Sequence, residues 1–138
     1  MKWTAALTIL ASTLLSGLSC ASAQTAAKAT IPFSFHVGSI VMPAGSYKLQ
    51  SETDRPNLLR LAQINGSADA YVLATTTRDS KAPAKLVFNK YGNLYFLRKT
   101  LRADGEDSMT FAASKVEKEI RSEKASLRTE SSIRVSSN

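Results

Sequence analysis

The segment from Lys85 to Arg102 constrains the fold more than any other part of this chain. Two apolar runs, 86–88 and 94–97, contain the aromatic and β-branched residues that suit a pleated, half-buried surface. Between them, Gly92 and Asn93 accept the positive φ that a tight hairpin turn requires. Both runs are apolar at successive positions, which is typical of strands in the middle of a sheet. The segment therefore predicts a central β-hairpin, and we expect Phe88 and Phe96 to pair in the core around which the other strands wrap.

Shorter alternating runs on either side of this hairpin predict further strands. Pro43 and Gly45 mark one turn, and Asn65-Gly66 is a strong signal for a two-residue hairpin turn. The predicted strands outside the hairpin are 31–37, 46–52, 58–64, 68–77 and a short piece at 109–111. Turns about ten residues apart favour a mainly β fold, a small antiparallel sandwich or barrel of six to seven strands over residues 31–112.

One C-terminal amphipathic helix is predicted within residues 113–128, from about Lys115 to Leu127. Ser114 and Glu117 have the spacing of a capping box, in which each side chain bonds to the other residue's amide. The apolar residues of this segment fall on one narrow helical face; they are Ala113, Val116, Ile120 and Leu127. Residues 129–138 are rich in serine and are predicted to be a disordered tail, with Ile133 and Val135 leaving open an extra edge strand.

The N-terminal residues 1–23 have the pattern of a secretory signal peptide. A positive start at Lys2 precedes an apolar run, and the run ends in Ala21-Ser22-Ala23, the small residues that signal peptidase accepts. We expect export to the periplasm or the medium, followed by a flexible leader over 24–30. A lipoprotein modified at Cys20 is the alternative. Cleavage after Ala23 leaves no cysteine and no transmembrane segment in the mature chain.

The charge balance favours anionic partners. The chain has 18 basic and 11 acidic residues; since Lys2 lies in the predicted signal peptide, the mature charge is +6. An anionic envelope polymer or a protein partner fits this balance, whereas export argues against nucleic acid. Because the basic residues are spread along the chain, a merely solubilising surface remains an alternative.

The sequence predicts no catalytic residue, no metal site and no cofactor. His36 is the single histidine, and cleavage removes the single cysteine, so neither a zinc site of N and S ligands nor a Cys–His pair is expected. Nucleophile-elbow and phosphate-loop motifs do not occur. Two weaker alternatives are a Ca²⁺ site at the acidic turn 104–107 and a carboxylate pair formed by Glu52 and Asp54.

Basic and aromatic residues interleave in the hairpin, which makes it the candidate binding surface. The predicted binding residues are Lys90, Tyr91, Tyr95 and Arg98, with the Tyr91 turn exposed to the partner. The leading hypothesis is an exported, non-enzymatic binding domain. The first alternative is a small apolar-ligand carrier, which requires a cavity lined by Phe33, Phe35, Phe88 and Phe96. The second is a hydrolase that uses only carboxylates.

Four motifs resemble those of a group of short exported bacterial proteins. They are Phe33-Ser-Phe-His-Val-Gly38, Pro43-Ala-Gly-Ser-Tyr47, the run from Leu86 to Leu97, and Ser114-Lys-Val-Glu117. The group shares the pattern F-x-F-x-V-G, P-A-G-x-Y, LVF-x-x-Y-G-x-x-YFL and S-x-x-E. This resemblance covers nearly the whole mature chain and implies an exported single domain of uncharacterised function. It implies no catalytic residues.

Overall fold

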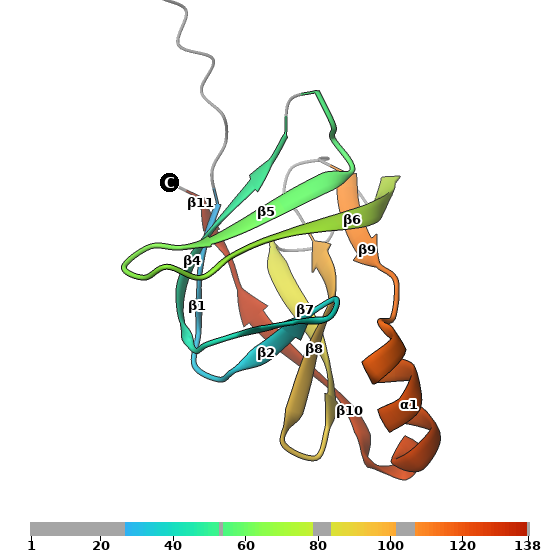
Figure 1. Ribbon diagram of the computed structural model, residues 1–138. Coiled ribbons are helices and arrows are strands. Elements are labelled where there is room, and N and C mark those ends of the chain that lie inside the picture. The colour runs from blue at the N-terminus through green and yellow to red at the C-terminus, as the bar shows by residue number, and fades with distance from the viewer. Residues whose placement is uncertain (1–26, 53, 79–83, 102–106, 138) are drawn as a thin grey trace, which may run out of the picture.

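The protein is mainly β with one α-helix, as the computed structural model shows for residues 27–52, 54–78, 84–101 and 107–137 (Figure 1). This confirms the predicted fold class, although the described residues form eleven strands where six to seven were predicted. The elements in chain order are β1 (Ala27–Ile31), β2 (Phe35–Val37), β3 (Ile40–Met42), β4 (Gly45–Ser51), β5 (Leu58–Gln63), β6 (Asp69–Arg78), β7 (Lys85–Tyr91), β8 (Leu94–Leu101), β9 (Asp107–Phe111), α1 (Lys115–Glu123), a 3-10 turn (Ala125–Leu127), β10 (Arg128–Arg134) and β11 (Ser136–Ser137).

Strand pairing runs almost in a closed ring. The order is β10-β7-β8-β9-β6-β5-β4-β1-β11, and every neighbouring pair along it is antiparallel. Only Val135 separates β10 from β11, so the two ends of the path belong to one continuous segment. A sheet whose last strand returns to its first leaves few open edges. The chain therefore forms a small barrel, with the β2–β3 hairpin packed beside β8.

Both strands of the β7–β8 hairpin are interior strands, as predicted, because β10 pairs with β7 and β9 pairs with β8. Tyr91 pairs with Leu94 around a two-residue turn, in which Gly92 has φ of 60°. A bulge interrupts the pairing between Val87 and Phe88. Four successive residues of β7, 86–89, are buried, so the strand is covered on both faces. This burial explains why its sequence does not alternate between apolar and polar residues.

Aromatic rings fill the barrel. Phe35, Tyr47 and Phe88 are fully buried, and the Phe35 ring meets the other two edge-on, with centroids 5.3 and 5.5 Å apart. Phe96 is also buried, but it does not pair with Phe88 in this core. Phe88 lies opposite Leu97, and the adjacent position Asn89 lies opposite Phe96. Because successive strand residues point to opposite faces, the expected Phe88–Phe96 pair is wrong.

Both ends of the described chain are more ordered than the sequence indicates. Residues 27–30, predicted as part of a flexible leader, belong to β1, which pairs with β4. Residues 129–137, predicted as a disordered tail, form most of β10 together with β11. Ladder hydrogen bonds use backbone groups alone, so a Ser-rich segment can complete a sheet. The predicted signal peptide 1–23 and Cys20 lie outside the described residues.

Helix α1 is shorter than predicted and presents a different face to the barrel. Ser114 caps it as expected, with its Oγ accepting from the Glu117 amide at 3.1 Å. Val116 and Leu127 of the expected apolar stripe are exposed, whereas Glu117 is buried. None of the helices in the described part of the chain combines the length and the hydropathy of a membrane span.

Candidate functional site

The structure separates the four residues that the sequence groups into one binding surface. Tyr91 is fully buried, so the prediction that it forms an exposed contact is wrong. The turn contains only Gly92 and Asn93, and Tyr91 is the last residue of β7. Strand alternation places Tyr91 on the same face as Asn89, which is the face that α1 covers. Tyr91 therefore belongs to the folded scaffold.

Beneath α1, a buried carboxylate joins the helix to β7. Glu117 accepts from Asn89 Nδ2 at 2.9 Å and from the Tyr91 hydroxyl at 3.3 Å. Burial, followed by the Glu117 carboxylate, raises the pKa of Tyr91 above its usual value of 10.0. The capping-box spacing predicts only the local role of Glu117. Its contact with a strand 28 residues earlier depends on tertiary structure.

Tyr95 and Lys90 form the outer end of an aromatic stack at the barrel mouth. Phe33 meets the buried Phe88 ring edge-on at 5.1 Å and stacks on Tyr95 at 3.7 Å with an angle of 13°. Lys90 Nζ lies 5.4 Å from the Tyr95 centroid. Phe33, Tyr95 and Lys90 are all partly exposed. The stack therefore leads from the core to an ammonium group at the surface.

The arrangement of this stack determines the kind of ligand that it suits. Phe33 already covers one face of the Tyr95 ring, so the Lys90 ammonium approaches from the other side. A neutral sugar would have to displace Lys90 in order to stack on Tyr95. An ammonium held over an aromatic ring still has protons to donate to an anion. The site thus suits negative charge better than a neutral ring.

Arg98 contacts the end of β9 and not the aromatic stack. It occupies the extra position in β8 at the bulge, between Leu97 and Lys99, and its Nη1 donates to the carbonyl of Phe111. That contact ties β8 to the end of β9, just before α1. The structure therefore gives Arg98 a role in holding these elements together, and its role in binding stays a prediction.

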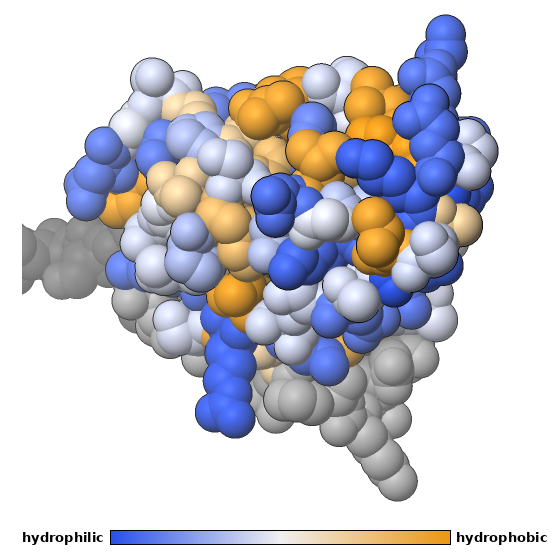
Figure 2. Space-filling view, turned by 90° about the horizontal axis from the view of Figure 1, so that it is seen from below, coloured by the Kyte–Doolittle hydropathy of each residue, from blue (hydrophilic) through white to orange (hydrophobic). Residues whose placement is uncertain are grey.

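The surface around the barrel mouth has no single apolar face. The hairpin turn lies at the lower end of the molecule in Figure 1, and Figure 2 shows the molecule from below. Apolar groups lie there in separate patches among hydrophilic side chains (Figure 2). Exposed Ile40 and Val41 belong to the β2–β3 hairpin. Scattered patches of this kind are normal on a protein surface.

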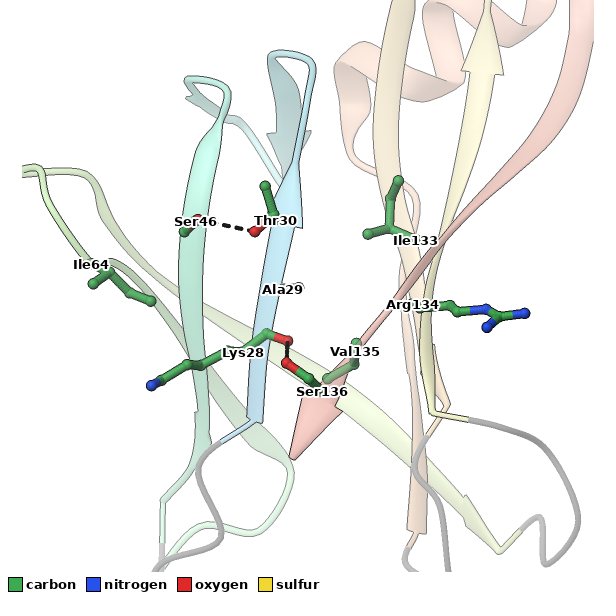
Figure 3. Close-up of a pocket in the computed structure, with 9 residues that line it drawn as sticks. All are labelled: Lys28, Ala29, Thr30, Ser46, Ile64, Ile133, Arg134, Val135 and Ser136. Atoms are coloured by element: carbon green, nitrogen blue, oxygen red, sulfur yellow. Dashed lines mark hydrogen bonds between the residues drawn. The ribbon is translucent and has the colours of Figure 1, made fainter. Parts of the chain in front are cut away.

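A groove that the sequence does not predict lies where β1 and β10 diverge (Figure 3). Its volume is about 640 Å³. The lining residues are Lys28, Ala29, Thr30, Ser46, Ile64, Ile133, Arg134, Val135 and Ser136. At its narrow end, Ser136 Oγ donates to the Lys28 carbonyl at 3.4 Å. Both charged lining residues are basic.

His36 is half-buried beside the hairpin, on β2. Its ring stacks on Phe96 with centroids 4.5 Å apart, and burial lowers the pKa of His36 below 6.5. Within the described ranges, no cluster of three or more His, Cys, Asp or Glu residues is placed to hold a metal ion. The predicted Ca²⁺ turn at 104–107 lies outside these ranges except for the backbone of Asp107.

The phenylalanines expected to line the cavity of an apolar-ligand carrier lie on two faces of the β7–β8 hairpin, because Phe88 pairs with Leu97 and Phe96 pairs with Asn89. Phe35 and Phe88 pack directly on each other and are fully buried, and the carrier stays an alternative prediction. The groove beside β1 is lined by none of the predicted phenylalanines. Asp54, one member of the carboxylate pair considered for hydrolysis, is exposed.

No family model, curated protein or solved structure matches this chain. The resemblance to short exported bacterial proteins therefore stays a prediction from the sequence.

Proposed function

We propose that this protein is an exported, non-enzymatic domain that binds an anionic polymer of the cell envelope. The observation that carries the proposal is the aromatic stack from Phe88 through Phe33 and Tyr95, which holds the Lys90 ammonium at the barrel mouth. The excess of basic residues over the whole chain supports it, because a net positive charge increases the local concentration of a polyanion.

The chain offers a matched control for this site on β5 and β6. The guanidinium of Arg60 lies 5.5 Å from the exposed Tyr71 ring, so Arg60, like Lys90, places one positive charge over a tyrosine. Arg60 also pairs with Asp69 at 2.6 Å, which neutralises its charge locally. Lys90→Gln and Arg60→Gln remove the same formal charge, each from beside a tyrosine ring, and the two sites differ in that Arg60 is already paired with Asp69.

The test measures the affinity of the mature chain for polygalacturonate, with neutral dextran as the control polymer. We expect wild-type protein to bind polygalacturonate, weakly at high salt because exposed charges are screened. Lys90→Gln should weaken this binding about 3- to 10-fold, because one solvent-exposed contact contributes about 1 kcal/mol. Arg60→Gln should leave the affinity within 2-fold of wild type.

Two results would contradict the proposal. An equal loss of affinity in both variants would mean that only total charge matters. Failure of the wild-type protein to bind polygalacturonate would rule out an anionic polymer as the ligand. Circular dichroism of both variants shows whether each keeps the β fold.

Export is the second part of the proposal, and it rests on the signal-peptide pattern of residues 1–23. N-terminal sequencing of protein recovered from the periplasm or medium of an expressing bacterium should begin at Gln24. Protein that starts at Met1 and stays with the cytoplasmic fraction would contradict export. Lipid attached to an N-terminal Cys20 would favour the lipoprotein alternative.

A further inference from the structure

In the part of the chain that the structure describes, no strand pairs with one edge of β10 over most of its length. Val135 N donates to the Ala84 carbonyl at 3.1 Å, on the β7 side of the segment. Because backbone groups of alternate residues point the same way, Thr129, Ser131 and Ile133 face β7. The amides and carbonyls of Glu130, Ser132 and Arg134 therefore point to the other side.

The strand that approaches this second edge is β1, and it pairs with the segment only at its very end. Among the described residues, this pairing consists of Ala27 with Ser137 and Lys28 with Ser136. Continuing that register would bring Thr30 opposite Arg134 and Pro32 opposite Ser132. The two strands separate instead, and the groove opens between them (Figure 3). Proline has no N–H to donate, so Pro32 could not complete a full ladder in any case.

The open edge is suited to pairing with another strand. Its outward residues Glu130, Ser132 and Arg134 are all exposed. The strand has no proline and no bulge, two of the devices that protect natural edge strands against pairing. The groove leaves space alongside the edge, at least near Arg134.

We infer that β10 pairs antiparallel with β10 of a second copy of this chain, about a twofold axis at Ser132. In this register the outward-facing residues meet each other: Ser132 lies opposite Ser132, and Glu130 lies opposite Arg134 of the second copy. The twofold axis repeats the Glu130–Arg134 pair, so the interface gains two ion pairs. Three hydrogen-bonded residue pairs supply about six backbone bonds.

Charge selects this register from the nearby ones. A twofold axis at Ser131 would place Arg128 opposite Arg134 of the second copy, and like charges directly opposite are destabilising. It would also make the residues that already bond to β7 face the second copy. The axis at Ser132 avoids both problems. The new pairing covers only Glu130 to Arg134, because Ser136 on the same edge already pairs with Lys28 of β1.

The interface is small, so the dimer should be weak. A single added strand pair falls at the low end of specific interfaces, so we expect a dimer with Kd of about 1–100 µM. Sedimentation equilibrium of the mature wild-type chain over this range should give a concentration-dependent monomer–dimer equilibrium. Lys90 lies opposite Thr129 on the β7 side of β10, away from the edge that pairs, so the Lys90→Gln variant should dimerise like wild type.

Charge exchange tests the register directly. Glu130→Arg places two arginines opposite each other, and Arg134→Glu does the same with two glutamates, so each variant alone should lose dimerisation at least 10-fold. In an equimolar mixture, each chain supplies the charge that the other lacks. Mixing the two variants should therefore restore a dimer that contains one chain of each kind.

A proline variant tests the edge without disturbing the barrel. The Ser132 amide points away from β7, so Ser132→Pro removes a bond of the dimer but no bond of the β10–β7 ladder. We expect Ser132→Pro to be a folded monomer by circular dichroism and sedimentation. A wild-type chain that is monomeric at 100 µM would overturn the inference. So would a dimer that survives both charge variants, or a charge-variant mixture that stays monomeric. If a monomeric wild-type chain instead captures an acidic peptide at this edge, the peptide is the partner and a second copy is not.

Discussion

Removing the buried carboxylate of Glu117 tests how α1 is attached to the barrel. Glu117→Ala leaves the Asn89 amide and the Tyr91 hydroxyl without their acceptor. The bond from Asn89, at 2.9 Å to a carboxylate, is expected to contribute about 1.5–3 kcal/mol. The bond from Tyr91, at 3.3 Å, is longer and is expected to contribute about 0.5–1 kcal/mol. We therefore expect the free energy of unfolding to fall by about 3 kcal/mol.

The assay is urea unfolding at pH 7 followed by circular dichroism, with thermal unfolding as a second readout. For a domain of about this size, 3 kcal/mol corresponds to a fall in Tm of about 10–15 °C. Glu119→Ala is the matched control, because it makes the same substitution on the same helix at an exposed position. If the two variants agree within about 0.5 kcal/mol, the buried cluster contributes nothing and the reasoning is refuted. In a double-mutant cycle, Asn89→Ala should couple to Glu117→Ala by about 1 kcal/mol or more.

Three other predictions follow from the hairpin and the core. Gly92→Ala should destabilise the protein by about 1 kcal/mol because φ at this position is 60°, whereas Gly92→Asn should cost clearly less; urea unfolding compares the two, and equal losses would argue against a left-handed turn residue. Burial lowers the pKa of His36 in the folded state, so its contribution to stability is present above pH 6.5 and is lost as the pH falls through the folded-state pKa. His36→Phe should keep the stack on Phe96 and flatten the fall in unfolding free energy just below pH 6.5; an unchanged profile would contradict this origin. Phe88→Ala should destabilise by about 3–5 kcal/mol because its ring is fully buried, whereas the exposed Tyr71→Ala should cost under about 1 kcal/mol, and similar losses in the two would contradict a core built on Phe88.

The sequence predicts the central hairpin well because its signals are local. Gly92 and Asn93 specify the turn, and the apolar residues of both arms specify strands covered on both faces. The sequence does not show which face of the sheet each side chain occupies. The bulge at Val87 and Phe88 and the pairing register place Phe96 and Tyr91 on the face away from the barrel core. Proximity to the turn made Tyr91 a candidate for exposure, although strand alternation places it beside Asn89.

The closing strand and the buried carboxylate depend on tertiary contacts and could not be predicted from composition. Residues 128–134 are mostly polar, and their order comes from backbone pairing with β7, to which side-chain identity contributes little. Ile133 and Val135, which pack against the core, are the signal that remains in the sequence. Glu117 matches a local capping motif, and this motif gives no indication of the contact between Glu117 and β7. The groove exists only because β1 and β10 meet at one end and separate at the other.

Closure of the barrel by its C-terminal segment is the central claim, and amide hydrogen exchange tests it most directly. In the monomeric Ser132→Pro variant, the amides of Thr129, Ser131 and Ile133 should exchange slowly because they bond to β7, and those of Glu130 and Arg134 should exchange fast. Exchange of all five amides at the rate of an unfolded peptide would show that the segment is disordered and that β7 and β1 are not joined.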